Sequence, residues 1–150
     1  MTFDFTVDGR PVSRCYTLSS SPTRPHLLSI TVKRTPDGVV SNWLHDNLRP
    51  GDEVRARGPY GLFTMDDHPA EKYLLLSGGS GATPFMSMAR ALPDTASDAN
   101  VVYLHSARTP LDVLFRDELH TIAQDCRASP LPTSARTTPG ASRGTATGDG

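Results

Sequence analysis

Residues 73–92 read YLLLSGGSGATPFMSMARAL, and this stretch decides the fold. The apolar run over residues 73–77 predicts a buried strand, and the apolar residues that recur over residues 83–92 predict an amphipathic helix. Glycines at positions 78, 79 and 81 stand between these two segments. A strand that turns through glycines into a helix is typical of an α/β unit, so the sequence predicts such a unit here.

The glycine turn is suited to hold a phosphate. The first N–H groups of a helix have no partner within the helix, and the helix dipole adds partial positive charge at the same end. Gly79 and Gly81 let an anion approach the backbone, and Pro84 fits the first helical turn, where a missing N–H costs nothing. The sequence therefore predicts that this turn binds a phosphate group.

Three other interpretations of the turn need weighing. An ATP-binding P-loop requires Lys and then Ser or Thr after its last glycine, and the sequence Ala-Thr-Pro at residues 82–84 excludes it. A nucleophile elbow would make Ser80 a hydrolase nucleophile, but His105 and His120 come too soon after it to complete that order. The third interpretation, a tight turn that binds nothing, stays open on the turn alone.

The flanking segments divide the chain into two modules. Residues 100–105 predict a second strand and residues 111–125 a second helix, with Phe115 and Leu119 in the core, which gives parallel α/β organisation. Residues 1–65 instead predict antiparallel strands, among them 26–35 and parts of 52–63, around one helix capped by Ser41. The predicted organisation is an antiparallel β module at 1–65, a linker at 66–72, a parallel α/β module at 73–126 and a disordered tail at 127–150.

Composition excludes several functional classes. No apolar run approaches the roughly 20 residues of a membrane-spanning helix, and residues 1–12 lack the pattern of a secretion signal. The formal net charge of −1 gives no argument for nucleic acid or a membrane surface as a partner. Cys15 and Cys126 are far apart and neither belongs to a metal-ligand pair, so we expect no metal and a reducing, cytoplasmic location.

Five motifs, taken together, resemble the ferredoxin–NADP reductase superfamily, and most of all its bacterial flavin reductase modules of the phenol-hydroxylase, flavohaemoglobin and hybrid-cluster-reductase types. These motifs are RCYTLSS (14–20), ITVKR followed by PDGVVSNWL (30–44), GPYGLF (58–63), GGSGATP (78–84) and VVYLHSARTPLDVLFRDEL (101–119). The resemblance covers roughly residues 1–126. It implies an antiparallel β-barrel that binds FAD, followed by a parallel α/β domain that binds NADPH or NADH.

The resemblance assigns FAD contacts to the first two-fifths of the chain. It implies that Arg14 pairs with the pyrophosphate, that Tyr16 lies against the isoalloxazine ring, and that Thr17 bonds near the N5 atom. These residue types suit those roles, because a guanidinium matches a diphosphate and an aromatic face matches a flat ring. Further FAD contacts are implied for Thr31, Val32 and Lys33, and for Gly38, Val39, Val40 and Ser41, the last of which also caps its helix.

The nicotinamide nucleotide is assigned to the second module. The resemblance seats its pyrophosphate on the glycine turn and places Thr83 where nicotinamide meets flavin, so that Tyr16, Thr17 and Thr83 stand closest to the reaction. The implied contacts are Gly79, Ser80, Gly81, Ala82 and Thr83, with Ser106 and Arg108 near the adenosine half. Arg108 would favour NADPH if it binds a 2′-phosphate, but a solvated arginine is the equal alternative, so NADH or NADPH stays open.

The implied activity is transfer of a hydride from NAD(P)H to FAD and then of single electrons to a partner: a ferredoxin, an iron–sulfur oxygenase or a haem protein. The cofactors carry this chemistry and the protein positions them. The sequence also departs from the family, since Arg14 lies near the start and no Cys-Gly-Pro follows residue 126. We therefore expect an N-terminally incomplete barrel, a partial nucleotide-binding domain and truncation at both ends. A non-catalytic remnant with residual cofactor binding is the alternative.

Overall fold

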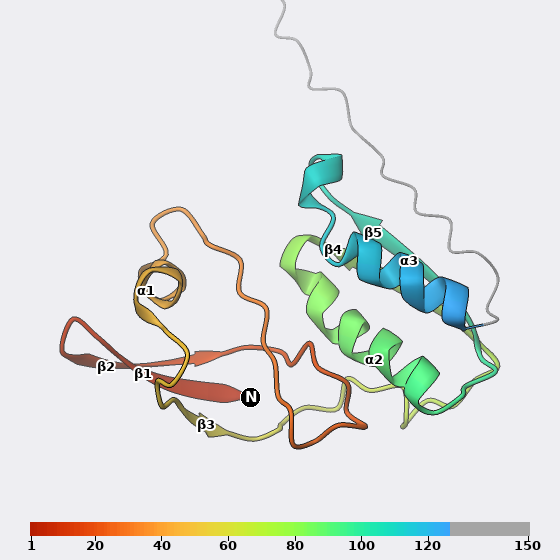
Figure 1. Ribbon diagram of the computed structural model, residues 1–150, viewed down its shortest axis with the longest axis horizontal. Helices are drawn as coiled ribbons and strands as arrows, with labels where there is room; N and C mark the ends of the chain where they lie inside the picture. Colours follow the sequence, from red (N-terminus) through yellow and green to blue (C-terminus); the bar gives the residue numbers. More distant parts are fainter. Residues whose placement is uncertain (127–150) are drawn as a thin grey trace, which may run out of the picture.

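The computed structural model describes residues 1–126, arranged as two modules (Figure 1). An antiparallel sheet with one helix comes first, and a parallel pair of strands with two helices follows. The tail predicted to be disordered, residues 127–150, lies outside the described residues. Within the described residues, no helix has the length and apolar character needed to cross a membrane.

The N-terminal module is built on a hairpin. Strands β1 (Thr2–Val7) and β2 (Arg10–Cys15) pair in antiparallel register, and β3 (Arg55–Arg57) pairs with the other edge of β1. The hairpin turn consists of Asp8 and Gly9, whose φ angles are 50° and 75°. Two positive φ angles define the turn that matches strand twist in two-residue hairpins, so the predicted Asp-Gly turn is confirmed.

Helix α1 (Val39–Asn47) covers one face of this sheet. Phe5 and Val7 alternate toward that face, where they are buried with Val40 and Leu44 of the helix. The ring centroids of Phe5 and Trp43 lie 6.1 Å apart, which extends the apolar contact along the helix. This small core fixes α1 relative to β1 and thereby places the turn that precedes the helix.

Three sequence predictions in this module need correction. Ser41 does not cap α1, because Gly38 is the N-cap and Ser41 is the third helical residue. The strand predicted over 26–35 is reduced to an isolated bridge between Leu18 and Ile30, since no neighbouring strand extends the pairing. The strand predicted over 52–63 is confined to β3, because Gly58 follows it with a φ of 130° and Pro59 has no N–H for a ladder.

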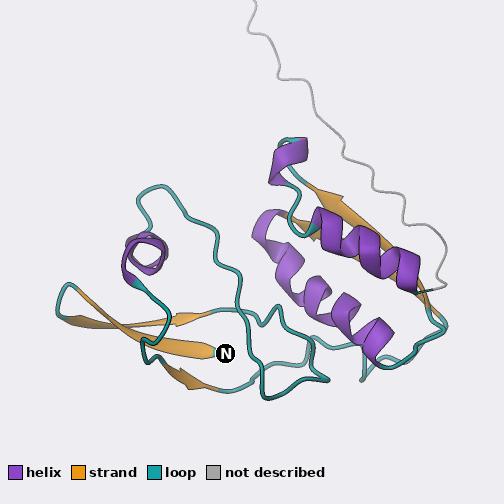
Figure 2. Ribbon diagram, viewed as in Figure 1, coloured by secondary structure: helices purple, strands orange, loops and turns teal. Residues whose placement is uncertain are grey.

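The C-terminal module follows the predicted order. Strand β4 (Lys72–Gly78), the short helix η1 (Gly79–Gly81), helix α2 (Ala82–Asp94) and strand β5 (Asn100–Ser106) form one strand–helix–strand unit, and β4 pairs in parallel with β5 from Lys72↔Asn100 to Gly78↔Ser106. Helix α3 (Arg116–Asp125) packs beside α2 over the same face of the sheet (Figure 2). This arrangement places the carboxyl ends of both strands next to the glycine turn.

The core of this module lies between the sheet and its two helices. Six buried residues form it, and they are Leu75, Met86, Ala89, Val101, Tyr103 and Leu119. The predicted core position of Leu119 agrees with this, and Phe115 packs partly buried against the same cluster. The opposite sheet face carries Leu74 and Leu76, which are 61% and 59% exposed.

The helix predicted over 111–125 begins later than the pattern indicated. Residues 110–112 form a separate short helix, η2 (Pro110–Asp112), closed by a capping box between Thr109 and Asp112. Phe115 then adopts a left-handed conformation with a φ of 58°, and α3 begins after it. Because a left-handed residue interrupts the helical hydrogen-bond ladder, apolar spacing alone merged two elements into one.

Candidate functional site: a cleft between the modules

A cleft of about 890 Å³ separates the two modules at the carboxyl ends of β4 and β5. Thr31, Val32 and Lys33 form its wall on the N-terminal module. The facing wall consists of the glycine turn, at Gly78, Gly79 and Ser80, of Ser106 at the end of β5, and of Arg108 in the loop that follows. Seven residues predicted from separate motifs therefore line one cleft: Thr31, Val32, Lys33, Gly79, Ser80, Ser106 and Arg108.

The glycine turn leaves room beside its backbone. Gly79 has a φ of 52°, a conformation that favours glycine, and among the described residues a Cβ atom at Gly79 or Gly81 would meet nothing within 4 Å. The turn leads directly into the N-terminus of α2, where the helix dipole adds partial positive charge and no side chain caps the helix, although the Ala82 N–H itself donates to the carbonyl oxygen of Ser80. A phosphate fits this donor set and this open space, so the residues present suit a dinucleotide.

Two predicted residues of the turn face the protein interior instead. Ala82 is fully buried and Thr83 nearly so, and neither lines the cleft. The Thr83 hydroxyl donates a hydrogen bond of 3.3 Å to the carbonyl oxygen of Ser80. In this structure Thr83 stabilises the turn, and its predicted place near the nicotinamide stays a prediction.

The charges that line the cleft favour an anion. Lys33 on one wall and Arg108 on the other are both exposed, whereas Asp112 is the one carboxylate among the lining residues. The Asp112 carboxylate is engaged by the Thr109 hydroxyl at 2.9 Å and by the Thr109 N–H at 3.2 Å. Two cations facing one partly satisfied carboxylate give the cleft a net attraction for phosphate.

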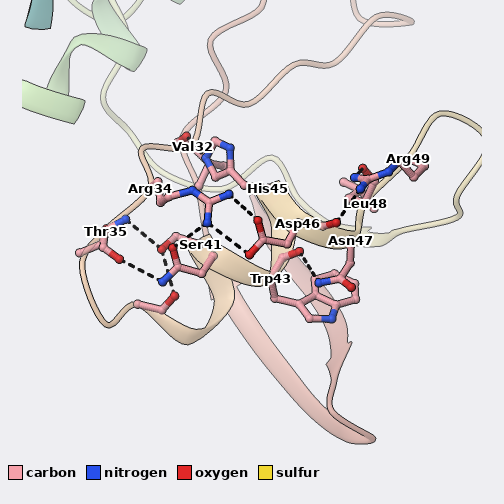
Figure 3. A network of polar contacts seen from close by, with 12 residues as sticks. Val32, Arg34, Thr35, Ser41, Trp43, His45, Asp46, Asn47, Leu48 and Arg49 are labelled. Atoms are coloured by element: carbon pink, nitrogen blue, oxygen red, sulfur yellow. Dashed lines mark hydrogen bonds and ion pairs between the residues drawn. The ribbon is translucent and has the colours of Figure 1, made fainter.

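Helix α1 supports the cleft wall of the N-terminal module (Figure 3). The His45 Nε2–H group donates to the carbonyl oxygen of Val32 at 2.9 Å, and Arg34 forms an ion pair with Asp46, with 2.6 Å between Nη2 and Oδ1. Residues 31–33 are thus held by side chains in place of a strand ladder. Sequence reasoning missed His45, although its spacing of four residues from Ser41 puts both on one face of a helix.

Ser41 is committed to the turn before α1 (Figure 3). Its hydroxyl donates to the carbonyl oxygen of Gly38 and accepts from the N–H of Thr35, both at 3.2 Å. A Cβ atom at Gly38 would lie 2.5 Å from the Ser41 oxygen, so this close approach requires glycine. The predicted hydroxyl contact with a phosphate would require Ser41 to exchange one of these bonds. Of the neighbouring predicted contacts, Val39 is exposed and Val40 is buried in the core.

Arg14, Tyr16 and Thr17 lie outside the lining of this cleft. The Arg14 side chain is exposed and donates to the carbonyl oxygen of Ser13 at 2.8 Å. Tyr16 is half-buried with its ring centroid 6.1 Å from that of Phe3, and burial raises the pKa of its hydroxyl despite the opposing charge of Arg14. Thr17 is exposed. The structure does not place these three residues at the cleft, and their roles in FAD binding stay predictions.

A buried polar group beneath the glycine turn was missed from sequence. Ser77 Oγ lies 2.8 Å from the Tyr103 hydroxyl and 2.7 Å from His105 Nδ1. Burial lowers the pKa of His105, and its Nε2 has no hydrogen-bond partner within residues 1–126. The alternation of residues along β4 and β5 was the signal that could have placed this group.

The family models match both modules. Residues 1–65 match the oxidoreductase FAD-binding domain, and residues 75–146 match the oxidoreductase NAD-binding domain, so the second match runs past the described residues. The chain belongs to the ferredoxin–NADP reductase superfamily. Within the described part of this chain, no group of three or more His, Cys, Asp or Glu residues is placed to hold a metal ion.

The relatives of this chain carry names of reductases and oxidoreductases. The glycine betaine monooxygenase reductase subunit of Pseudomonas aeruginosa is 53% identical over 82% of this chain and 34% of its own length. An NADH oxidoreductase of Escherichia coli is 43% identical over 70% of this chain and 33% of its own. A cytochrome P450 reductase structure from Amycolatopsis has a TM-score of 0.71 and 28% identity, over 84% of this chain and 39% of that one. The chain spans about a third of the length of these curated relatives.

Several sequence predictions are settled by these comparisons. The superfamily, the order of an antiparallel FAD-binding module before a parallel α/β module, and the cofactor pair of FAD with NAD(P)H are confirmed. The domain boundaries, the individual site residues and the expected truncation stay predictions.

Proposed function

We propose that this chain is an FAD-dependent NAD(P)H oxidoreductase that passes electrons to an iron–sulfur or haem protein. The observation that carries the proposal is the shared cleft, which brings the ITVKR segment of the FAD-binding module opposite the glycine turn of the NAD-binding module. Transfer of a hydride needs two cofactors with their reacting atoms about 3–3.5 Å apart, and a cleft walled by both modules is the place where this can occur.

When bound, FAD accepts a hydride, which is two electrons with one proton, from NAD(P)H and then releases the electrons one at a time to the acceptor. The protein's residues bind and orient. The glycine turn and the N-terminus of α2 neutralise the nucleotide pyrophosphate, and Lys33 and Arg108 add positive charge on the two walls. We assign Arg14 to the flavin pyrophosphate, and Tyr16 and Thr17 to the flavin ring. No side chain acts as a strong acid or base in this scheme.

The acceptor is proposed to belong to an oxygenase system. Two of the relatives support this, because one is named as a monooxygenase reductase subunit and the other as a cytochrome P450 reductase. Reduction of a plant-type ferredoxin and of cytochrome c by the flavin-loaded chain, followed as separate absorbance changes, distinguishes an iron–sulfur from a haem acceptor. Reduction of neither protein would contradict the electron-transfer half of the proposal.

A flavin spectrum tests the first half of the proposal. Purified protein supplied with FAD is expected to be yellow after gel filtration, and its flavin bands should bleach when NADH or NADPH is added without oxygen. A colourless protein that takes up no FAD would overturn the proposal and favour the non-catalytic remnant. A yellow protein that neither nucleotide bleaches would bind FAD without turnover. That result would also favour the non-catalytic remnant.

Arg14→Ala tests the assignment of the flavin pyrophosphate. The matched control is Arg10→Ala, because Arg10 is also exposed on β2 and lies at the other end of that strand. Loss of a charged contact to a diphosphate is expected to weaken FAD binding about tenfold or more in Arg14→Ala. Equal FAD affinities of the two variants, measured by flavin fluorescence titration, would remove Arg14 from the site.

A further inference from the structure

One face of α2 is joined to the N-terminal module far from the glycine turn. Ser87, Arg90 and Asp94 are spaced by three and four residues, so they project from one side of the helix. All three contact residues 19–24, the loop that follows the RCYT motif, and Figure 1 shows this loop reaching from β2 toward α2. We call these three residues and the loop 19–24 the latch.

Asp94 is the most heavily engaged residue of the latch. Its carboxylate accepts hydrogen bonds from the hydroxyl of Ser21 at 2.8 Å, from the hydroxyl of Thr23 and from the guanidinium of Arg24. The Asp94 side chain is 14% exposed. Hydrogen bonds from Arg24, Thr23 and Ser21, in that order, lower the pKa of Asp94 to about 2, so the carboxylate stays charged at any working pH.

Arg90 and Ser87 join the backbone of the same loop. Arg90 donates through Nη1 to the carbonyl oxygen of Ser19, and Ser87 donates through its hydroxyl to that of Ser20 at 2.6 Å. Arg90 is itself fixed within the second module by two bonds of 2.7 Å to Glu118 and by the ring of Phe115, whose centroid lies 5.4 Å from its Cζ. A side chain held from two sides has few alternative rotamers, so it transmits position well.

The serine part of the junction between loop and helix is buried, whereas Thr23 and Arg24 are exposed. Ser19, Ser20 and Ser21 are 1%, 8% and 6% exposed. Polar groups removed from water must be hydrogen-bonded, because leaving one unpaired is costly. The buried serines therefore favour one fixed geometry of the loop against α2 over a set of similar geometries.

Both ends of this connection reach the cleft. Ser19 Oγ lies 3.0 Å from the Thr31 hydroxyl, and the Ser19 N–H donates to the carbonyl oxygen of Ser29 at 2.8 Å. Thr31 is part of the wall on the N-terminal module, while α2 itself begins at the glycine turn of the facing wall. A shift of α2 against the loop would therefore change the spacing between the two walls.

We propose that Asp94 and Arg90 are positioning residues, and that the latch sets the spacing of the cleft walls at which hydride transfer is fast. This inference rests on the proposed function for its chemical consequence. A displacement of the reacting atoms by about 1 Å slows such a step by about 100-fold. A connection that is rigid and placed outside the cleft can hold that spacing while leaving the cleft open to both cofactors.

The first test measures geometry and needs no cofactor. The chain carries one free cysteine in each module, Cys15 on β2 and Cys126 at the end of α3, so nitroxide labels on both report the distance between modules. Wild-type protein is expected to give one narrow distance distribution. Asp94→Asn should broaden it about twofold or more, because the neutral amide loses the charge that holds Arg24.

Asp4→Asn is the matched control. Asp4 accepts from a serine, Ser13 at 2.6 Å, and from an arginine, Arg57 at 3.0 Å, but all three residues belong to the N-terminal module. The inference expects a distribution as narrow as wild type in Asp4→Asn. The double variant Arg24→Asp with Asp94→Arg exchanges the two charges. Its distance distribution is expected to be narrower than that of either single variant. Equal widths in wild type, Asp94→Asn and Asp4→Asn would overturn the latch.

The second test measures the chemical consequence. With FAD bound, Asp94→Asn is expected to slow flavin reduction by NADH about tenfold and to raise the isotope effect of C4-deuterated NADH, while the nucleotide dissociation constant changes less than about twofold. A purely structural role would instead lower the folded fraction and leave the rate per folded flavoprotein unchanged, which would overturn the positioning role. If the chain takes up no FAD, the proposed function fails, and the distance measurement still decides whether the latch sets the spacing.

Discussion

The two ends of α2 are built in opposite ways. At its N-terminus, the glycine turn exposes backbone N–H groups to an open cleft, and the space beside Gly79 and Gly81 is empty of neighbours among the described residues. Toward its C-terminus, Arg90 and Asp94 are bound to the loop 19–24 of the other module, which is buried at residues 19–21. One helix therefore has an open end, which we propose binds the nucleotide, and a closed end that joins the two modules.

This difference teaches how one short helix can combine affinity with alignment. Groups that must bind a ligand have to remain unsatisfied until it arrives, which costs the folded chain stability. Groups that align two modules have to be fully satisfied to keep a single geometry. Placing the two tasks at opposite ends of the helix avoids this conflict. Variants that act on one end alone can test whether the two tasks are separate.

Met86→Ala acts on both ends together and is expected to have the largest effect. Met86 lies between the ends of α2 and is 1% exposed in the core of the second module. Removing a buried side chain of this size destabilises a domain by about 2–5 kcal/mol. Urea unfolding followed by circular dichroism measures this free energy.

Leu76→Ala is the control for Met86→Ala, since Leu76 lies on the other sheet face and is 59% exposed. Its expected effect is within about 0.5 kcal/mol. A comparable loss in both variants would mean that the face carrying Leu76 is covered in solution, and the core would have to be redrawn.

The boundaries of α2 and of the strands beside it could be predicted because their signals are local. The apolar run, the glycines and Pro84 fall within one continuous stretch, and the observed elements β4, α2 and β5 begin and end within two residues of their predicted limits. The position of the glycine turn could be predicted for the same reason, because its motif is short, whereas its binding of a phosphate stays a prediction.

The joining end could not be predicted, because its contacts link residues far apart in the sequence. Asp94 and Ser21 are separated by 73 positions, and Arg90 and Ser19 by 71. The failed strand over 26–35 has the same cause, since a strand exists only where a partner continues the ladder. The N-cap of α1 was predicted three residues too late, at Ser41. The observed N-cap is Gly38, whose turn brings its backbone close to the Ser41 side chain.

Gly79→Ala isolates the open end and is expected to have the next largest effect. Its φ of 52° disfavours a side chain by about 1–2 kcal/mol, and the new methyl would occupy the space proposed for the phosphate. We expect NADH or NADPH to bind about 10- to 100-fold more weakly, as measured by fluorescence titration, while the nitroxide distance across the latch is unchanged.

Gly9→Ala is matched to Gly79→Ala, because Gly9 also has a positive φ, 75°, and no neighbour within 4 Å among the described residues, but it lies in the β1–β2 turn. Both variants should lose similar stability. Equal loss of nucleotide affinity in the two would show that strain, and not the site, is responsible.

Arg108→Gln examines which nicotinamide nucleotide the open end prefers. If the guanidinium binds a 2′-phosphate, removing it should weaken NADPH about tenfold and leave NADH within about twofold. Arg116→Gln is the control, because Arg116 is also exposed but lies at the start of α3. An equal change for both nucleotides would assign Arg108 to general attraction of phosphate, and no change for either would place it in solvent.

The two ends should also respond differently to pH, which is the smallest expected effect. At the joining end Asp94 keeps its charge until about pH 2. Beneath the open end, burial lowers the pKa of His105 below its usual value of 6.5. Near pH 8, well above 6.5, His105 is neutral in both the folded and the unfolded chain, so it contributes no pH dependence there.

Below pH 6.5 the unfolded chain takes up the proton before the folded chain does, so the free energy of unfolding falls as the pH falls, by at most about 1.4 kcal/mol per pH unit. Urea unfolding between pH 8 and pH 5 measures this slope, and His105→Gln should flatten it. A slope that survives in His105→Gln would assign the pH response to another group. A slope lost in His105→Gln, together with a latch distance that is constant from pH 8 to pH 5, would show that protonation loosens the open end while the joining end holds.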